Sequence, residues 1–402
     1  MRRLLLVDCD QFFVQCARLA DPEGAGREPL LLVGGSPSGR GVVTSASYET
    51  REYGCRSAMP TARALRLCPK AKVVPVPRKL CGRKSREVRE VLRRFTPLVE
   101  AASIDEAYLD LTGTEALYHD EPLTETARRI QAAVKEATDI TVSIGGGPTR
   151  VVAKLAAERA KPAGVFVVAQ DEVGPFMEAF ELRDIPGVGP VLGERLRTMG
   201  LVRVTDALPL GESELEAMLG PGRGAWLYRR IRGRGSDVVE PRSPAKSISR
   251  EETFPEDLRT DEELERELMA LAIRVASDLR RQGLRARTVT VKIKDGDFRQ
   301  RTASRTLDQP LESDRAILAV AKELLGTLRK RRRTGARLVG VGVSHFSTGE
   351  EGTQLVLFDA DETAPALETD RDRRISRVAD ELRERFGHDA IRPGRLVEPS
   401  DS

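Results

Sequence analysis

The sequence predicts a multidomain protein of the α+β class. The chain has 402 residues, which is enough for several compact units that each bury a core. Apolar strand-like runs alternate with helical patterns up to about residue 168, and the chain becomes helical from Val173. A punctuated segment rich in Gly, Ser and Pro, at 232–244, then precedes a second module in which strands and helices alternate again.

The elements of the first module predict a sheet that helices cover on one face. Strands are expected at 1–10, 30–33, 42–43, 73–76, 140–145 and 165–168, and a strand hairpin at 99–111. Helices are expected at 12–20, 46–53, 59–68, 83–94, 123–138 and 150–159. In the second module we expect strands near 247–249, at 286–294 and at 337–344, with helices at 261–282 and 314–331. The tail adds a strand-like run at 354–358 and a charged helix at 369–386.

Composition excludes several classes of protein. With 40% hydrophobic and 32% charged residues the chain is typical of a folded, soluble protein. Five cysteines without a CxxC pair, among three histidines, argue against a zinc site and favour reduced thiols in the cytoplasm. No apolar stretch is long enough to span a bilayer, and Asp8 ends the first apolar run too early for a signal peptide.

Charge is distributed unevenly along the chain, although the net charge is only +4. Residues 241–349 carry 23 Lys and Arg against 16 Asp and Glu, whereas 350–402 carry 8 against 14. A basic module followed by an acidic tail indicates a polyanionic partner for the first segment and not for the second. Solvated surface charge is the alternative for either segment taken alone.

Two acidic clusters about a hundred residues apart lie on strand-like runs. The first is Asp8-Cys9-Asp10 after four apolar residues, and the second contains Asp105 and Glu106. Carboxylates in buried strands are costly unless a cation or strong donors compensate them. If the two strands are neighbours, Asp8, Asp105 and Glu106 can bind a pair of Mg²⁺ ions that clamp a phosphoryl transfer. Ordinary acids at strand ends or in turns are the alternative.

Donors suited to a triphosphate follow the first cluster. The segment 44–51 supplies hydroxyls, the phenol of Tyr48 and the guanidinium of Arg51, which can engage phosphate oxygens with two donors. Lys161 stands at a helix end before Pro162. Such a Lys-Pro-x-Gly segment is by itself more typical of a simple helix stop.

The order of the motifs resembles one known family. The chain contains VDCDQFF, GRGVVTSASYETREYGCRSAMP, SIDEAYLD, VSIGGGPTRVVAKLAAERAKPAG and DIPGVGP in that order. Over about residues 1–346 it resembles the Y-family translesion DNA polymerases, in particular the bacterial DNA polymerase IV type. The resemblance implies a DNA-directed DNA polymerase shaped as a right hand, in which small fingers and a separate α/β little finger accompany the palm and the helical thumb.

The domain boundaries and site residues that follow are implied by the resemblance. They are palm 1–10 and 76–168, fingers 11–75, thumb 169–233, linker 234–245, little finger 246–346 and tail 347–402. Asp8 and Asp105 would bind both Mg²⁺ ions, Glu106 would bind the ion at the primer 3′ hydroxyl, and the Cys9 carbonyl would add a ligand. The nucleotide contacts would be Phe12, Phe13, Ser45, Tyr48, Arg51 and Lys161. Phe13 would select the sugar, since its ring would exclude a 2′ hydroxyl, although an ordinary core aromatic is the alternative.

The resemblance also implies surfaces for DNA and for a sliding clamp. Gly187 and Gly189 belong to a helix-hairpin-helix that can bind a phosphate through backbone amides. Basic residues expected along one sheet face of the little finger would follow the DNA backbone; they are Lys246, Arg285, Arg287, Lys292, Lys294, Arg299, Arg301 and Arg305. Gln354, Leu355, Leu357 and Phe358 resemble a clamp-binding peptide, and an edge strand is the alternative. Ala17 and Thr149-Arg150 depart from the family pattern.

The predicted function is therefore template-directed DNA synthesis of the low-fidelity translesion type, without a proofreading exonuclease. Primer-template DNA and deoxynucleoside triphosphates would be its partners, and the chain would act as a monomer away from membranes. The alternative is a non-catalytic adaptor of the mutasome that binds the clamp. A nucleotidyl cyclase with the same two-metal chemistry would have no use for the hairpin or the basic module.

Overall fold

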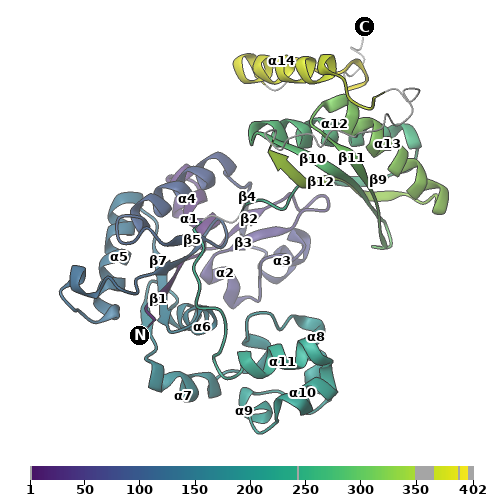
Figure 1. Ribbon diagram of the computed structural model, residues 1–402. Coiled ribbons are helices and arrows are strands. Elements are labelled where there is room, and N and C mark those ends of the chain that lie inside the picture. The colour runs from purple at the N-terminus through teal and green to yellow at the C-terminus, as the bar shows by residue number, and fades with distance from the viewer. Residues whose placement is uncertain (1, 242–243, 349–365, 388–389, 397–402) are drawn as a thin grey trace, which may run out of the picture. The chain divides into compact units, whose positions relative to one another are not determined.

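The computed structural model describes residues 2–241, 244–348, 366–387 and 390–396. The chain divides into two compact units, Met1–Ser243 and Pro244–Ser402, which are described separately (Figure 1). Within the described residues, no helix combines the length and the apolar character that crossing a membrane requires. All five cysteines are buried free thiols.

A five-stranded sheet forms the centre of the first unit (Figure 1). Its strands in spatial order are β5 (Val99–Ala101), β6 (Glu106–Asp110), β1 (Leu4–Cys9), β7 (Val142–Gly147) and β8 (Val165–Val167). β1 lies in the middle, antiparallel to both neighbours, and all six of its residues are buried. A strand that is apolar on both sides requires cover on both faces of its sheet.

Helices cover both faces of this sheet, so the expectation of a single covered face is wrong. They are α1 (Phe12–Ala20), α4 (Arg78–Leu92), α5 (Leu123–Thr138) and α6 (Arg150–Ala160). Leu5 and Val7 of β1 pack in the cluster that contains α1, α4 and α5. Leu4 and Leu6 pack instead against α6. The reason is the unbroken apolar run of β1, in which alternate residues point to opposite faces.

Two smaller substructures complete the first unit. The fingers hold a three-stranded sheet, β3-β2-β4, and two short helices. Their bounds are β2 (Leu31–Gly34), β3 (Val43–Ala46), β4 (Lys72–Val74), α2 (Tyr48–Glu52) and α3 (Thr61–Leu67). The thumb contains α7 (Val173–Glu178), α8 (Pro190–Thr198), α9 (Val204–Ala207), α10 (Glu212–Leu219) and α11 (Pro221–Arg230). Its core includes Val151, Val152 and Leu155, so α6 belongs to the cores of both palm and thumb.

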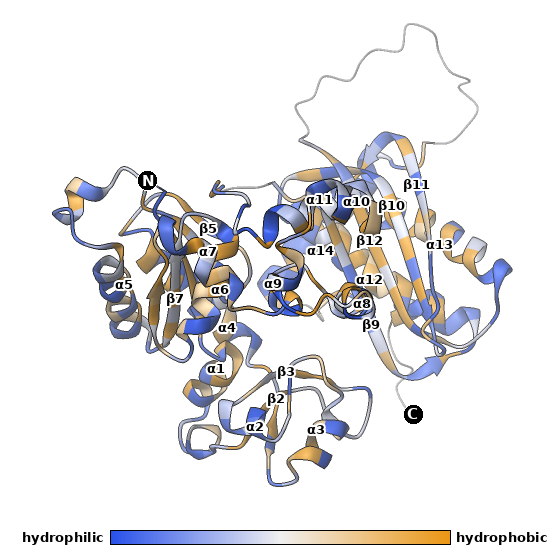
Figure 2. Cartoon of the chain, turned by 90° about the horizontal axis from the view of Figure 1, so that it is seen from below, coloured by the Kyte–Doolittle hydropathy of each residue, from blue (hydrophilic) through white to orange (hydrophobic). Residues whose placement is uncertain are grey.

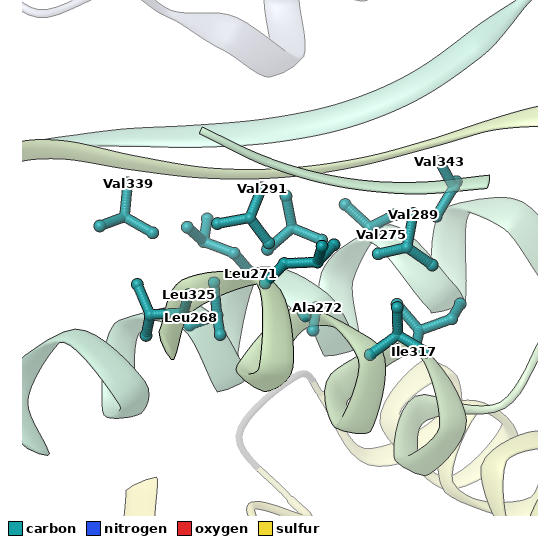
Figure 3. Close-up of a cluster of buried hydrophobic side chains, with 14 of the residues drawn as sticks. Leu268, Leu271, Ala272, Val275, Val289, Val291, Ile317, Leu325, Val339 and Val343 are labelled. Atoms are coloured by element: carbon teal, nitrogen blue, oxygen red, sulfur yellow. The ribbon is translucent and has the colours of Figure 1, made fainter. Parts of the chain in front are cut away.

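The second unit is a four-stranded antiparallel sheet in the order β11-β10-β12-β9. The strands are β9 (Ser247–Leu258), β10 (Leu284–Asp295), β11 (Gln300–Leu311) and β12 (Ala336–Thr348). Helices α12 (Asp261–Arg281) and α13 (Asp314–Arg331) cover one face. Figure 3 shows side chains such as Leu271, Val291 and Val339 filling the space between the helices and the sheet. Sequence analysis missed β11, because this edge strand is polar and buries few of its residues.

Hydrophobic and hydrophilic residues alternate along β10 and β12 (Figure 2), which leaves a polar face opposite the helices. Hydroxyl groups pair across β10 and β11 on that face: Thr288 with Thr306 and Thr290 with Ser304, each at 2.9 Å. Cross-strand hydroxyl pairs of this kind hold the register of an antiparallel pair. The polar face is therefore lined by small hydroxyl side chains.

A C-terminal helix, α14 (Asp370–Phe386), packs on α12 and α13 within the second unit (Figure 1). The helix predicted at 369–386 is thus confirmed. Elsewhere in the described residues, short 3₁₀ segments lie at Ala25–Arg27, Glu115–Tyr118, Gln170–Glu172, Leu182–Asp184 and Gly394–Leu396. The run 354–358, with the proposed clamp contacts, lies outside the described residues.

Helix α6 packs closely against strand β7 in the first unit. β7 ends in three consecutive glycines, and a Cβ added at Gly145 would lie 2.0 Å from the backbone nitrogen of Ala157 and 2.2 Å from the carbonyl oxygen of Ala153. At such separations the helix must move, because both contacts are to backbone. Gly145 therefore sets the distance between α6 and the sheet.

We expect Gly145→Ala to lower the free energy of unfolding of the first unit by about 3 kcal/mol or more, because the added methyl group clashes with α6. Gly222→Ala is the matched control, since it lies in helix α11 with open space at the Cβ position. It should be neutral or stabilising by about 0.5–1 kcal/mol. Urea denaturation followed by circular dichroism measures both. Equal stabilities for the two variants would contradict the close packing of α6.

Candidate active site

The two acidic clusters meet on neighbouring strands at the same end of the sheet. Asp8 of β1 lies directly opposite Glu106 of β6 in the antiparallel register. The backbone nitrogen of Cys9 donates a hydrogen bond of 2.9 Å to the carbonyl oxygen of Asp105. Sequence segments about a hundred residues apart are therefore joined at this point, as the sequence predicts for Asp8, Asp105 and Glu106.

Asp8 and Glu106 point toward helix α6. Leu4 and Leu6 of β1 pack against α6, and Asp8 continues the same alternating face. Directly paired residues of an antiparallel pair share a face, so Glu106 lies on this side as well. Asp8 is only 6% exposed, whereas Glu106 is half-buried.

Two lysines of the α6 region compensate these carboxylates. Nζ of Lys161, at the C-terminal end of α6, lies 2.9 Å from Oδ2 of Asp8 and 2.8 Å from Oε1 of Glu158. Nζ of Lys154 lies 2.6 Å from Oε1 of Glu106. Sequence analysis missed Lys154, although its spacing of seven residues from Lys161 places both on one side of a helix.

Burial dominates the ionisation of Asp8. Desolvation raises its pKa to about 7 although the ion pair with Lys161 acts in the opposite direction, and the nearby Glu106 adds to the rise. Burial also acts to lower the pKa of Lys161, but Asp8 and Glu158 outweigh it and raise that pKa. The carboxylate of Asp8 is thus incompletely compensated by its lysine, a condition in which added positive charge favours the ionised form.

Hydrogen bonds within the turn before β6 hold the third acid, Asp105. The Ser103 hydroxyl donates to Oδ1 of Asp105, and its oxygen accepts from the backbone nitrogens of Asp105 and Glu106 at 3.1 and 3.0 Å. In the described part of the chain, no three Asp, Glu, His or Cys side chains are grouped so that they could hold a metal ion. The backbone brings the three acids together, but each side chain turns to its own partner. Their oxygens are nevertheless the ligands that Mg²⁺ prefers.

Asp10, the other acid of the first cluster, connects the palm to the fingers. Its Oδ1 accepts hydrogen bonds from the Ser143 hydroxyl at 2.7 Å and from the Tyr48 hydroxyl at 3.0 Å. Its Oδ2 accepts from the backbone nitrogen of Ala163 at 3.0 Å. Asp10 therefore orients helix α2 and the segment after α6 around Asp8.

The residues expected to contact a triphosphate lie on β3, on α2 and at the end of α6. Ser45 is a buried residue of β3, and Tyr48 and Arg51 stand one turn apart on α2. Nε of Arg51 donates to the Ala46 carbonyl oxygen at 3.0 Å, and its guanidinium lies 4.8 Å from the centroid of the Tyr48 ring. Burial, followed by the charge of Asp10, raises the pKa of Tyr48, so its hydroxyl remains a hydrogen-bond donor.

Phe12 and Phe13 begin helix α1 directly after the first acidic cluster. Their ring centroids are 5.5 Å apart at an interplanar angle of 71°. Phe12 is 1% exposed and belongs to the palm core, whereas Phe13 is half-buried. Phe13 is thus the ring of the pair that solvent can reach.

Thr149 and Arg150, which depart from the family pattern, tie α6 to its surroundings. Thr149 caps α6 by accepting from the backbone nitrogen of Val152, and its hydroxyl donates to the Gly233 carbonyl oxygen at 2.7 Å. Arg150 binds Glu100 with two hydrogen bonds of 2.7 and 2.8 Å. Its guanidinium also lies 4.1 Å from the centroid of the Tyr108 ring. The two residues have a structural role in the palm.

The predicted hairpin of the thumb leads into helix α8. Gly187 adopts a φ of 103°, which favours glycine, and a Cβ there would lie 2.5 Å from the Trp226 ring. Gly189 is the N-cap of α8, and Pro190 is its first residue. The tight turn therefore requires Gly187, while Gly189 leaves open space at the start of the helix.

The basic residues of the second unit do not form one face, so that expectation is wrong. Arg301 binds Asp295 and the Leu328 carbonyl oxygen, and Arg305 pairs with Glu323 of α13, so both lie on the helix-covered side. Other basic residues form ion pairs: Arg285 with Glu368, Lys292 with Glu251, and Arg299 with Asp297. Arg287 donates hydrogen bonds to the carbonyl oxygens of Leu307 and Asp308. Lys246 is exposed. Alternation along a strand sends successive residues to opposite faces.

A second group of cations, near the end of β10, was only partly found from the sequence. Phe298 follows β10 with a φ of 66°, a strained value for an aromatic residue, and it is 61% exposed. The Arg337 guanidinium lies 4.6 Å and Nζ of Lys294 lies 5.6 Å from the centroid of its ring. Among the described residues, neither cation pairs with an acid. Sequence analysis named Lys294 but missed Arg337 and Phe298, because their contact forms only when the strands pair.

Three family models match the chain. The impB/mucB/samB family matches residues 7–158, its C-terminal domain matches residues 245–357, and the HHH motif of the IMS family matches residues 171–201. The first match spans both acidic clusters and the lysines up to Lys154. The third spans the hairpin of Gly187.

Curated relatives and solved structures agree with these models. The chain is 40% identical over 352 residues to DNA polymerase IV of Xanthomonas oryzae pv. oryzae, covering 88% of this chain and 96% of that one. It is 36% identical over 394 residues to DNA polymerase IV of Caulobacter vibrioides, covering 97% and 93%. A chimera of the Y-family DNA polymerases Dbh and Dpo4 superimposes with a TM-score of 0.75 at 27% identity, covering 85% and 98%. The chain therefore belongs to the impB/mucB/samB family of Y-family DNA polymerases and is a DNA-directed DNA polymerase of the DNA polymerase IV type.

Proposed function

We propose that this polymerase adds deoxynucleotides to a primer 3′ end by two-metal-ion phosphoryl transfer, with low fidelity and without a proofreading exonuclease. The observation that carries the proposal is the pairing of Asp8 with Glu106 on buried neighbouring strands, beside Asp105. The related Dbh polymerase has been solved as an insertion ternary complex and as a post-insertion binary complex. These complexes support a cycle in which DNA and a nucleotide bind together.

Asp8 and Asp105 would hold two Mg²⁺ ions, Glu106 would bind the ion at the primer end, and the Cys9 carbonyl would add a ligand. Bound Mg²⁺ lowers the pKa of the primer hydroxyl and neutralises charge on the α-phosphate. The oxygen donors and the incomplete compensation of Asp8 fit such a cation. The side chains of Asp8 and Glu106 would first have to leave Lys161 and Lys154.

The nucleotide triphosphate would bind between α2 and the end of α6. Ser45, Tyr48 and Arg51 supply donors from the fingers, and Lys161 supplies a cation next to Asp8. A triphosphate arriving with Mg²⁺ would give Lys161 a new anionic partner when Asp8 turns to the metal. The hydrogen bond from Tyr48 to Asp10 holds α2 in place during this exchange.

Phe13 would exclude ribonucleotides, with Phe12 as its support in the palm core. A half-buried ring beside the acids can pack against C2′ of a deoxyribose and leaves no room for a hydroxyl. The T-shaped contact with Phe12 restricts the position of the ring.

DNA would contact both units through its phosphates. Backbone amides after Gly187 and Gly189 suit a phosphate without reading sequence. In the second unit we assign the DNA contact to the polar face, with Lys294 and Arg337 as its cations beside Phe298. Arg301 and Arg305 are better explained as structural residues, because they bind groups on the helix-covered side.

A sliding clamp remains the proposed partner of Gln354, Leu355, Leu357 and Phe358, whose apolar side chains suit a groove that captures an extended peptide. We propose that the chain acts as a monomer on this clamp. A non-catalytic adaptor is disfavoured, because Asp8 and Glu106 face each other on paired strands and Asp105 directly precedes the second of these strands.

Glu106→Ala should reduce Mg²⁺-dependent primer extension by at least about a hundredfold, since it removes a carboxylate from the reacting centre. Glu136→Ala, an exposed acid of α5, is the matched control and should leave the rate unchanged. Single-nucleotide incorporation on a primer-template duplex measures both rates. If the purified wild-type chain added no nucleotide, the adaptor alternative would replace the proposal.

Phe13→Ala should raise the incorporation of ribonucleotides relative to deoxynucleotides by tenfold or more, because the ring no longer fills the space at C2′. The ratio of kcat/KM for the two sugars is the measurement. Val91→Ala, in helix α4, serves as the control: it should lower thermal stability by loosening the palm core while leaving sugar selection intact. An unchanged ratio in Phe13→Ala would remove Phe13 from the sugar-selecting role.

Arg337→Gln and Lys294→Gln should each weaken duplex DNA binding and reduce the slope of log Kd against log salt by about 1. Arg305→Gln, whose side chain pairs with Glu323, should change the slope less. Fluorescence anisotropy at several salt concentrations measures these slopes. A larger change in Arg305→Gln than in Arg337→Gln would return the DNA contact to the residues predicted from sequence.

A further inference from the structure

Helix α14 packs on the rest of the second unit with its polar side inward and its apolar side outward, which is the reverse of the usual arrangement. A helix on the surface of a domain normally buries its apolar stripe and exposes its charges. In α14 the buried residues are Asp372 and Ser376, at 8% and 3% exposure. Its apolar residues Ile375, Val378 and Phe386 are 57%, 46% and 64% exposed.

Charged contacts hold this helix in place. Oδ2 of Asp380 lies 2.7 Å from a guanidinium nitrogen of Arg280 in α12. A guanidinium nitrogen of Arg377 lies 2.6 Å from Oε1 of Glu312. The Ser376 hydroxyl oxygen accepts from the backbone nitrogen of Asp314 at 3.1 Å. The polar side of α14 therefore makes the contacts with the rest of the unit. Its apolar side has no partner inside the described part of the unit.

The three exposed apolar residues and the half-buried Leu382 form one continuous stripe. Ile375, Val378, Leu382 and Phe386 are spaced by three, four and four residues, so they follow a single line along the helix. Within the described residues, none of the four belongs to the hydrophobic core of the unit. An exposed stripe of this size on a helix marks a site for a partner.

A row of arginines borders this stripe. Arg371 and Arg374 precede Ile375 and Val378 by four residues each, and Arg385 follows Leu382 by three. All three are exposed, and none forms an ion pair with another described residue. The guanidinium of Arg385 lies 5.3 Å from the Phe386 ring. The three arginines outnumber Glu381, an exposed acid on the same flank, so the border of the stripe has a net positive charge that suits an acidic partner.

A second copy of the chain is a poor occupant. In an antiparallel two-fold pairing the same flank of each helix meets its equivalent, so the arginine row would face the arginine row of the other copy. In a parallel pairing the arginine row would face the opposite flank, which is occupied by the docking contacts of Asp372. Like charges at a helix interface act against association.

We propose that the outer face of α14 binds an acidic amphipathic helix of another protein. Aliphatic residues of that helix would cover the stripe of Ile375, Val378, Leu382 and Phe386, and its acids would pair with the arginine row. The family model of the C-terminal domain ends at residue 357, so this surface lies beyond it. The interaction is independent of nucleotide addition and of the clamp contact.

The test uses the full chain and a synthetic three-heptad peptide with Leu at positions a and d and Glu at e and g. At neutral pH this peptide does not pair with itself, because its own charges repel. A peptide with Lys in place of Glu is its matched control. In fluorescence anisotropy at low salt, the acidic peptide should bind at least ten times more tightly than the basic one. Its affinity should fall as salt is added.

Variants of the chain locate the contact. Val378→Asp should weaken the binding of the acidic peptide at least tenfold. Arg374→Glu should reduce or reverse the preference of the chain for the acidic over the basic peptide. Leu117→Asp, a 76% exposed position in the first unit, is the control and should leave binding intact. All three variants should keep primer extension and circular dichroism unchanged.

Equal binding of the acidic and basic peptides would overturn the proposal, as would tight binding that Val378→Asp leaves intact. Light scattering provides a separate outcome. If the full chain were a dimer that Val378→Asp converted into a monomer, a second copy and not a foreign helix would be the occupant.

Discussion

The close approach of α6 to β7 is the constraint on which the rest of the first unit depends. Gly145 and Gly147 of β7 face α6, and they lack the side chains that would otherwise separate the helix from the strand. At this distance the lysines of α6 reach Asp8 and Glu106, and its N-terminal residues join the thumb core. One helix thereby fixes the compensation of the acids and the connection between palm and thumb.

Two kinds of buried acid follow from this packing. Asp10 is satisfied by Ser143, Tyr48 and Ala163, and such full hydrogen bonding is typical of a structural carboxylate. Asp8 relies on Lys161, and burial still raises its pKa. This difference indicates a structural role for Asp10 and supports the metal-binding role that we propose for Asp8, although a single residue separates the two.

The two faces of the sheet in the second unit carry different kinds of side chain. Aliphatic side chains fill the space between the sheet and the helices, while small hydroxyl residues line the opposite face. On the far side of the helices, ion pairs hold α14 in place, and its apolar residues Ile375, Val378 and Phe386 are exposed. A nucleic acid and a protein partner could therefore use different faces of this small domain.

The sequence by itself determined the fold class, the strands of Asp8 and Glu106 and the terminal helix, because strong apolar periodicity and acids at strand ends are local signals. It did not reveal the polar edge strand β11, the cover on both faces of β1 or the pairing of Lys154 with Glu106. Only the tertiary structure decided those features. A strand period of two shows that alternate residues point to opposite faces of the sheet, but it does not show which face meets a helix. An ion pair between residues 48 positions apart, such as Lys154 and Glu106, exists only after the chain has packed.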